Sequence, residues 1–141
     1  MELFREFFKI IGELNKENAP YAVVGGIALA FYELPRFTKD IDILGTPAYI
    51  SKYEKVLNSL GYFRSSEPWT FTNTNMTLHR FVKSGDDQEL IVVDLLIGHE
   101  ADHEHIIKNA ISDESYIGTV KIANREDLIH LKRLRNSEQD H

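Results

Sequence analysis

Cysteine is absent from the 141 residues of the sequence, which excludes disulfides, thiolate zinc sites, iron–sulfur clusters and cysteine nucleophiles. Glycine contributes 8 residues and proline 4, well short of a disordered or fibrous composition. Long apolar runs are also lacking, since none approaches the roughly 20 residues that cross a bilayer. The N-terminal segment mixes charged with apolar residues, unlike a secretory signal. We therefore expect a cytoplasmic protein with no membrane partner.

Basic residues are the minority among the charged ones, with 16 Lys and Arg against 22 Asp and Glu and a formal net charge of −6. Binding to long nucleic acids relies on cations that neutralise phosphates, so this balance makes a long nucleic acid an unfavoured partner. The hydrophobic share of 43% and the charged share of 27% are ordinary for a globular protein. The length suits a single domain over residues 1–141, able to bury roughly two-thirds of its unfolded surface.

Hydrophobic periodicity and turn residues predict the secondary structure. Helices are predicted over residues 2–16, 27–34, 47–60 and 100–111, and after Asn124. Strands are predicted over residues 21–24, 39–44, 70–83, 89–97 and 115–122, with a hairpin turn at 84–87. Asn124 can cap the last helix, with Asp127 as a reciprocal cap. The order of elements predicts an α/β (α+β) fold in which helices flank a mixed β-sheet.

Two acidic residues share one face of the strand predicted over 39–44. Side chains two apart on a strand point the same way, so Asp40 and Asp42 lie together while Ile41 and Ile43 point into the core. Neighbouring carboxylates repel each other unless a cation lies between them, and Mg²⁺ and Mn²⁺ prefer such hard oxygen ligands. The pattern also fits a solvated strand face in which Asp42 pairs with a Lys or Arg.

A third aspartate, Asp94, stands inside the apolar run from Leu90 to Ile97. A buried charge is costly unless it is paired or bound to a metal, so Asp94 is either a site residue or the partner of a base. On neighbouring strands, the three aspartates would form a triad able to hold two divalent ions.

Gly25 and Gly26 follow an apolar strand and precede a helix. Glycine lets the backbone approach a ligand closely, and a helix N-terminus offers free N–H groups to phosphate oxygens. A tight turn from strand to helix is the simpler explanation of the pair alone. Neither a third glycine nor a Gly-Lys-Ser/Thr sequence completes a known nucleotide-binding motif.

The order of these features carries more information than each feature alone. The segment VVGGIALAFYELPRFTKDIDIL, followed far along the chain by LIVVDLL, resembles the nucleotidyltransferase superfamily that includes DNA polymerase β. Residues 34–38 narrow the resemblance to the small prokaryotic nucleotidyltransferases of the abortive-infection and toxin–antitoxin type. The C-terminal VKIANREDLIHLKRLRNSEQDH is similar to the closing segment of that group. The resemblance implies a minimal nucleotidyltransferase fold.

The resemblance also implies a role for each matching residue. The catalytic, metal-binding residues would be Asp40, Asp42 and Asp94. The residues that bind the nucleotide would be Gly25, Gly26, Arg36, Thr38 and Lys132. An NTP would be the substrate, and Mg²⁺ or Mn²⁺ the cofactor. Apart from the resemblance, Lys132 is equally a cation near a helix C-terminus, where the helix dipole favours it.

The implied activity is transfer of a nucleoside monophosphate from an NTP to an acceptor hydroxyl. The acceptor stays open between a protein partner, a tRNA end and a small molecule. An alternative keeps the same fold but makes the protein an antitoxin or regulatory module of a toxin–antitoxin pair.

A competing motif follows the third aspartate. The run His99-Glu100-Ala101-Asp102-His103 matches H-E-x-x-H, which on a helix would hold zinc in a metalloprotease. The motif follows a glycine and lies among polar residues, whereas zinc proteases place it within a buried helix. A solvated first helical turn is the simpler interpretation, and the zinc site is kept as a minor alternative.

Several aromatic and basic residues precede the hairpin turn. Trp69, Phe71 and Phe81 are expected to pack in the core or along the hairpin rather than to stack on a base. The pair His79-Arg80 could reach the mouth of the site, although a histidine here is more typical of an exposed strand surface.

Overall fold

The computed structural model describes residues 2–32, 40–71, 74–86, 88–116 and 118–139, with only the backbone at 115, 116 and 134–139. The α-helices are α1 (Glu2–Lys16), α2 (Gly25–Phe31), α3 (Ile50–Ser59), α4 (Ala101–Lys108) and α5 (Arg125–Gln139). A 3-10 turn at Pro47–Tyr49 leads into α3. The strands are β1 (Ala22–Val24), β2 (Asp40–Gly45), β3 (Phe63–Arg64), β4 (Trp69–Thr70), β5 (Met76–Ser84), β6 (Leu90–Gly98), β7 (Ile111–Tyr116) and β8 (Gly118–Ile122).

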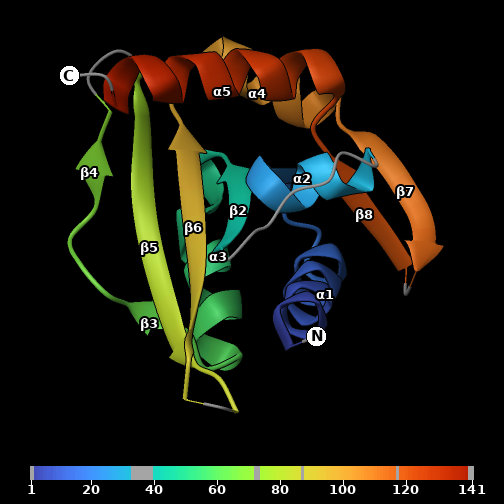
Figure 1. Ribbon diagram of the computed structural model, residues 1–141, viewed down its shortest axis with the longest axis vertical. Helices are drawn as coiled ribbons and strands as arrows, with labels where there is room; N and C mark the ends of the chain where they lie inside the picture. Colours follow the sequence, from blue (N-terminus) through green and yellow to red (C-terminus); the bar gives the residue numbers. More distant parts are fainter. Residues whose placement is uncertain (1, 33–39, 72–73, 87, 117, 140–141) are drawn as a thin grey trace.

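The described strands form one mixed sheet, which confirms the predicted fold class. Their order is β3-β5-β6-β2-β1-β8-β7, and β4 pairs with β5 outside this path. Strand β2 runs parallel to β6 and antiparallel to β1, while β1 runs parallel to β8. Helix α5 lies along the end of the sheet above β5 and β6, with α4 beside it (Figure 1). The aspartate-bearing strands β2 and β6 are therefore adjacent in the middle of the sheet.

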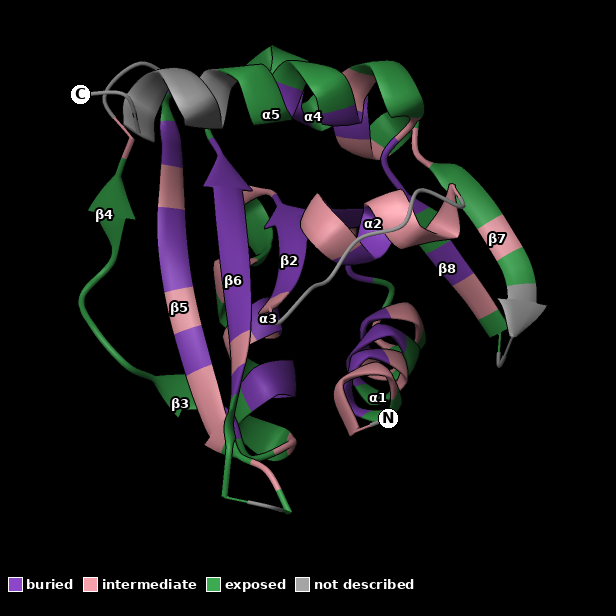
Figure 2. Ribbon diagram, in the orientation of Figure 1, coloured by how far each residue is buried: buried purple, intermediate pink, exposed green. Residues whose placement is uncertain are grey.

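Burial follows the alternation predicted for the central strands. Ile41 and Ile43 are buried on one side of β2, and neighbouring α1 contributes Phe7 and Ile10 to the same core. Strands β2 and β6 are buried over most of their length (Figure 2). A polar residue on these strands is therefore held in a fixed, largely dry environment, as a preorganised site requires.

One predicted strand is instead two strands that fold back on each other. The chain turns between β4 and β5, where Asn75 adopts a left-handed conformation with φ of 50° and the Phe71 N–H bonds to the Met76 carbonyl at 2.9 Å. Asparagine tolerates this conformation better than most residues. The alternation of polar and apolar residues does not reveal the turn. The turn brings Trp69 opposite Leu78 on β5.

Two other boundaries also differ from the prediction. The helix expected over 100–111 ends at Lys108, because Ile111 pairs with Ile122 at the edge of the sheet. The strand expected over 115–122 is divided between β7 and β8, which form an antiparallel pair. Residues after Lys108 pair at the edge of the sheet although their apolar residues have helical spacing. This pairing is a tertiary contact, which the local sequence pattern does not reveal.

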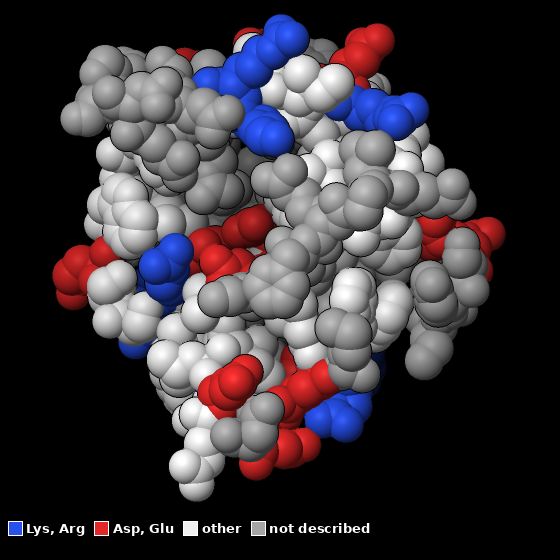
Figure 3. Space-filling view, viewed as in Figure 1, with Lys and Arg blue, Asp and Glu red and all other residues white. Residues whose placement is uncertain are grey.

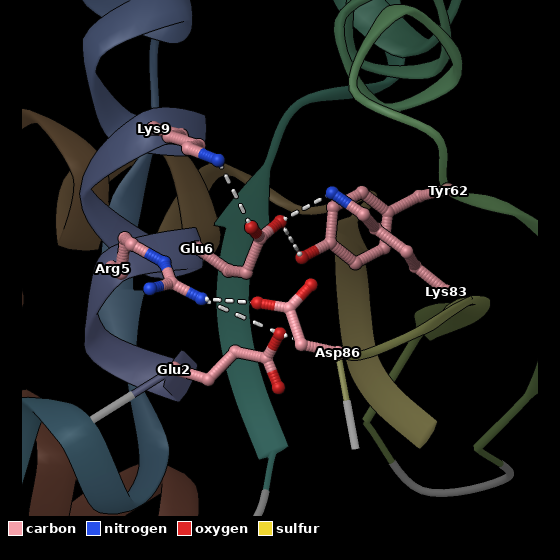
Figure 4. A network of polar contacts seen from close by, with 7 residues as sticks. All are labelled: Glu2, Arg5, Glu6, Lys9, Tyr62, Lys83 and Asp86. Atoms are coloured by element: carbon pink, nitrogen blue, oxygen red, sulfur yellow. Dashed lines mark hydrogen bonds and ion pairs between the residues drawn. The ribbon is translucent and has the colours of Figure 1, made fainter. Parts of the chain in front are cut away.

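A buried carboxylate joins α1 to the rest of the fold (Figure 4). Glu6 is 4% exposed and accepts hydrogen bonds from Lys83 at 2.7 Å, Tyr62 at 2.9 Å and Lys9 at 3.2 Å. Burial would raise the pKa of Glu6, but the hydrogen bonds from Lys83, Tyr62 and Lys9 outweigh it and lower that pKa. The network holds α1 against β5 on the far side of the molecule from α5.

Candidate active site

The three aspartates predicted from the sequence lie on one side of the sheet, close to one another. Asp42 on β2 lies opposite Val24 on β1 and opposite Asp94 on β6. Asp94 in turn lies opposite Arg80 on β5. These four positions form a single row across β1, β2, β6 and β5. Asp40 lies two residues from Asp42 on β2, and so faces the same way. Figure 3 shows acidic side chains in a hollow near the middle of this face, with basic side chains beside it over β5 and above it over α5.

Gly25 is the first residue of α2 and lies against Asp42. Its φ is +72°, in the left-handed region, and a Cβ added there would lie 2.1 Å from the Asp42 Oδ2. Glycine is thus required both by the backbone conformation and by the approach of the carboxylate. The pair of glycines predicted as a turn is instead the first turn of α2, and it stands directly beside the first aspartates.

Arg80 binds both carboxylate oxygens of Asp94. Its Nε–H donates to Oδ1 at 2.7 Å and its Nη2–H donates to Oδ2 at 3.0 Å. Asp94 is 2% exposed, so this paired guanidinium is what makes its burial tolerable. The hydrogen bonds to Asp94 raise the pKa of Arg80 against the effect of burial, and the charges of Asp94, Asp40 and Asp42 add to the increase. All three carboxylates therefore act on one guanidinium.

The carboxylates suit a divalent cation in their chemistry. Asp40 and Asp42 offer hard oxygen donors from one face of one strand, and the missing side chain of Gly25 leaves the space that the Asp42 carboxylate fills. Within the described residues, no set of three acidic or histidine side chains is already gathered around a single point as metal ligands. Asp94 is neutralised by Arg80 instead. The oxygen donors of Asp40 and Asp42 are of the kind that Mg²⁺ and Mn²⁺ take, and the assignment of Asp40, Asp42 and Asp94 as metal ligands stays a prediction.

His79 and Arg80 are neighbours on β5 and point to opposite sides of the sheet. Arg80 reaches the acidic row, as the sequence allowed. His79 is buried rather than exposed, and its Nδ1 lies 2.8 Å from Arg64 Nη1. Burial, aided by the charge of Arg64, lowers the pKa of His79 and favours the neutral ring. His79 therefore belongs to the packing of β3 on β5 and not to the site.

Trp69 is a site neighbour that sequence patterning missed. The expectation of packing in the core or along the hairpin holds for Phe81, which is fully buried, and for Phe71, which packs at the edge of the core. Trp69 pairs with Leu78 of β5 but remains 43% exposed, and the Arg80 guanidinium carbon lies 5.8 Å from the centre of its ring. Only the turn between β4 and β5 brings the indole to this place.

Four further residues were predicted to bind the nucleotide, namely Gly26, Arg36, Thr38 and Lys132. Gly26 follows Gly25 in the first turn of α2. Lys132 is exposed on α5, and its assignment to the phosphates stays a prediction. Arg36 and Thr38 lie outside the described residues.

The H-E-x-x-H run does not have the geometry of a zinc-binding helix. Helix α4 begins at Ala101, so His99 precedes it and Glu100 is its N-cap residue. His99 Nε2 lies 2.9 Å from Thr77 Oγ1, whereas His103 Nδ1 accepts the Glu100 N–H at 3.3 Å. The histidines are thus engaged separately, and the segment acts as a helix cap, which argues against the metalloprotease alternative.

Comparison with known proteins bears on the fold. No family model matches the sequence, and no curated protein matches it. Among solved structures, a Thermotoga maritima protein assigned as a nucleotidyltransferase (TM1012) is 18% identical, with a TM-score of 0.67 over 96% of this chain and 88% of that one. The chain has the nucleotidyltransferase fold.

Two further structures share this fold. ANT(2″)-Ia, in complex with adenylyl-2″-tobramycin, is 19% identical, with a TM-score of 0.58 over 95% of this chain and 76% of its own. The lincosamide antibiotic adenylyltransferase LnuA, with lincomycin bound, is 14% identical, with a TM-score of 0.51 over 89% of this chain and 83% of its own. These likenesses confirm the fold that the sequence resemblance implied. Among the described residues, no helix combines the length and the apolar character that crossing a membrane requires.

Proposed function

We propose that this chain is a metal-dependent nucleotidyltransferase that moves a nucleoside monophosphate from an NTP to an acceptor hydroxyl. The observation that carries the proposal is the arrangement in which Gly25, the residue after β1, lies against Asp42 on β2, and Asp42 lies beside Asp94 on β6, within a nucleotidyltransferase fold. Two of the similar structures are named for adenylyl transfer or an adenylylated product, so ATP is the first donor to test.

The position of each residue in the row would determine which reactant it contacts. The triphosphate would lie at the start of α2, next to Asp40 and Asp42, where the resemblance puts Gly25 and Gly26 against it. A divalent ion bound by Asp40 and Asp42 would supply charge neutralisation to the triphosphate oxygens. The acceptor hydroxyl would lie beside Asp94, on the side of the row away from Gly25.

The reaction is a single substitution at phosphorus. A bond forms between the acceptor oxygen and the α-phosphorus, while the bond from that phosphorus to the bridging oxygen breaks and pyrophosphate leaves. The hydroxyl proton passes to Asp94, whose carboxylate Arg80 keeps in a fixed orientation. Holding the reactants in line and balancing their charge provide most of the rate in such transfers.

Calorimetric titration tests this proposal directly. ATP, GTP, CTP and UTP are each titrated with Mg²⁺ or Mn²⁺ into the wild-type protein and the Asp40→Ala/Asp42→Ala variant. We expect metal-dependent binding of at least one NTP, lost in the variant while its circular dichroism is unchanged. If no NTP binds to the folded wild-type protein, the transferase proposal is wrong and the regulatory-module alternative gains support. The matched control is Glu54→Ala, which removes an acidic side chain that is paired with Arg64 on the other side of β5.

A further inference from the structure

Arg80 and Trp69 lie next to each other at one end of the row that contains Asp42 and Asp94. Gly25 lies against Asp42 at one end of the row, and the row continues through Asp94 and Arg80, with Trp69 beside Arg80 at the other end. If the triphosphate lies at the glycine end, as the proposed function holds, the other reactant must approach from the opposite end. The face that the acceptor meets there is a guanidinium beside an indole.

The guanidinium still has hydrogen-bonding capacity for a ligand. Arg80 donates to Asp94 through Nε and Nη2. Its Nη1 group makes no hydrogen bond to a described residue, so that side of the guanidinium is available to a ligand. The Arg80 side chain is 38% exposed, although its partner Asp94 is buried. A guanidinium in this state suits a second oxyanion, since its planar fork matches the oxygens of phosphate or carboxylate.

The indole adds a flat apolar surface to the same place. Trp69 is 43% exposed on the short strand β4 and does not belong to the hydrophobic core. An exposed tryptophan beside an arginine is a platform on which a planar ring can stack, and stacking is the contact that proteins use for bases without reading their sequence.

From these contacts we infer that Arg80 and Trp69 form the acceptor subsite, and that the acceptor carries an anionic group and a planar ring close to its hydroxyl. This inference rests on the proposed function for the direction of approach. A nucleotide has all three features, either as a free mononucleotide or as the 3′ end of an RNA strand. A polycation such as tobramycin, which ANT(2″)-Ia holds in adenylylated form, has no oxyanion for the guanidinium fork of Arg80 to bind.

The net charge of the chain agrees with a short contact of this kind. At −6, the chain as a whole does not attract a long phosphate backbone. One guanidinium at the end of the row needs only a single phosphate, and the stacked ring supplies binding that does not depend on charge.

Fluorescence of Trp69 provides the test, because it is the only tryptophan in the chain. The donor position is first filled with Mg²⁺ and α,β-methylene ATP, an analogue whose bridging carbon prevents transfer. Adenosine, AMP, the dinucleotide ApA and tobramycin are then titrated separately. We expect AMP or ApA to change the emission and to bind at least about tenfold more tightly than adenosine, as one charge-assisted contact would give. Tighter binding of ApA than of AMP assigns the subsite to an RNA end, and the reverse assigns it to a free nucleotide.

Variants separate the subsite from the fold. Arg80→Gln should abolish the preference for AMP and ApA over adenosine, whereas the matched Arg64→Gln, on the opposite side of β5, should keep it. If the single variant does not fold, Arg80→Gln/Asp94→Asn removes both charges of the pair and serves in its place. Trp69→Leu, followed by calorimetry, should weaken all three adenine probes by about fivefold or more.

The outcomes distinguish this inference from the proposed function. If the ATP analogue binds but AMP and ApA bind no better than adenosine, or Arg80→Gln keeps their preference, the acceptor subsite is wrong while the transferase stands. Tighter binding of tobramycin than of AMP also overturns it. If the analogue does not bind, the proposed function fails, and a phosphate preference that depends on Arg80 then supports an anion site without the transferase.

Discussion

Replacement of Gly25 by alanine probes the geometry on which the site depends. The residue has φ of +72°, and a Cβ there would lie 2.1 Å from Asp42 Oδ2 and 2.8 Å from Asp42 Cγ. The left-handed conformation alone costs an L-residue about 1–2 kcal/mol. Overpacking against a side chain held in a sheet adds about 1–3 kcal/mol.

We therefore expect Gly25→Ala to lower the free energy of unfolding by about 2–5 kcal/mol, a large part of the stability of an ordinary domain. In urea this corresponds to a midpoint lower by about 1–2.5 M with an unchanged slope. Gly12→Ala is the matched control, since Gly12 lies inside α1 with nothing within 4 Å of its added Cβ. That variant should instead be more stable by about 0.5–1 kcal/mol, because alanine loses less backbone entropy in a helix.

A double variant separates strain from collision. Asp42→Ala removes the two closest atoms that the new methyl group meets, so Gly25→Ala/Asp42→Ala should be more stable than the sum of the single effects predicts, by about 1 kcal/mol or more. Urea unfolding of the four proteins measures this coupling. A Gly25→Ala protein within about 0.5 kcal/mol of wild type would refute the close approach of α2 to the carboxylate.

Three further predictions concern the rest of the fold. Glu6→Gln should destabilise by about 2 kcal/mol at neutral pH, because a buried carboxylate loses charge-assisted hydrogen bonds. Since the folded-state pKa of Glu6 lies below its ordinary value of 4.5, its contribution is complete above that value and is lost as the pH falls through the folded pKa, so the wild-type and variant unfolding curves should converge in acid. Asn124→Ala removes the cap that accepts the Asp127 N–H at 2.9 Å and should cost about 1 kcal/mol in thermal unfolding, with no loss if the cap is not formed. Arg80→Gln strands the buried Asp94 carboxylate and should lower stability by about 3 kcal/mol, most of it recovered in Arg80→Gln/Asp94→Asn; equal stability of the two variants would contradict the buried pair.

The fold class and the acidic residues could be read from local pattern. Alternation around Asp40 and Asp42 fixes which side of the strand they occupy, because neighbouring isoleucines must enter the core. The charge of Asp94 within an apolar run marks it for pairing or function in the same way. The Asn124 cap also followed from residue type, and the structure bears it out.

Contacts between distant segments were decided only by the tertiary structure. Local pattern gave no sign that Arg80 would neutralise Asp94, because their pairing depends on the register of β5 against β6. Trp69 was expected to pack in the core or along the hairpin, and the turn at the left-handed Asn75 places it on β4 against β5, with the indole beside Arg80. Thus the amino-acid sequence determined which side chains could form an acidic site, through short-range periodicity and the cost of burying charge. The pairing of strands, which joins residues far apart along the chain, determined which cation and which aromatic ring stand next to that site.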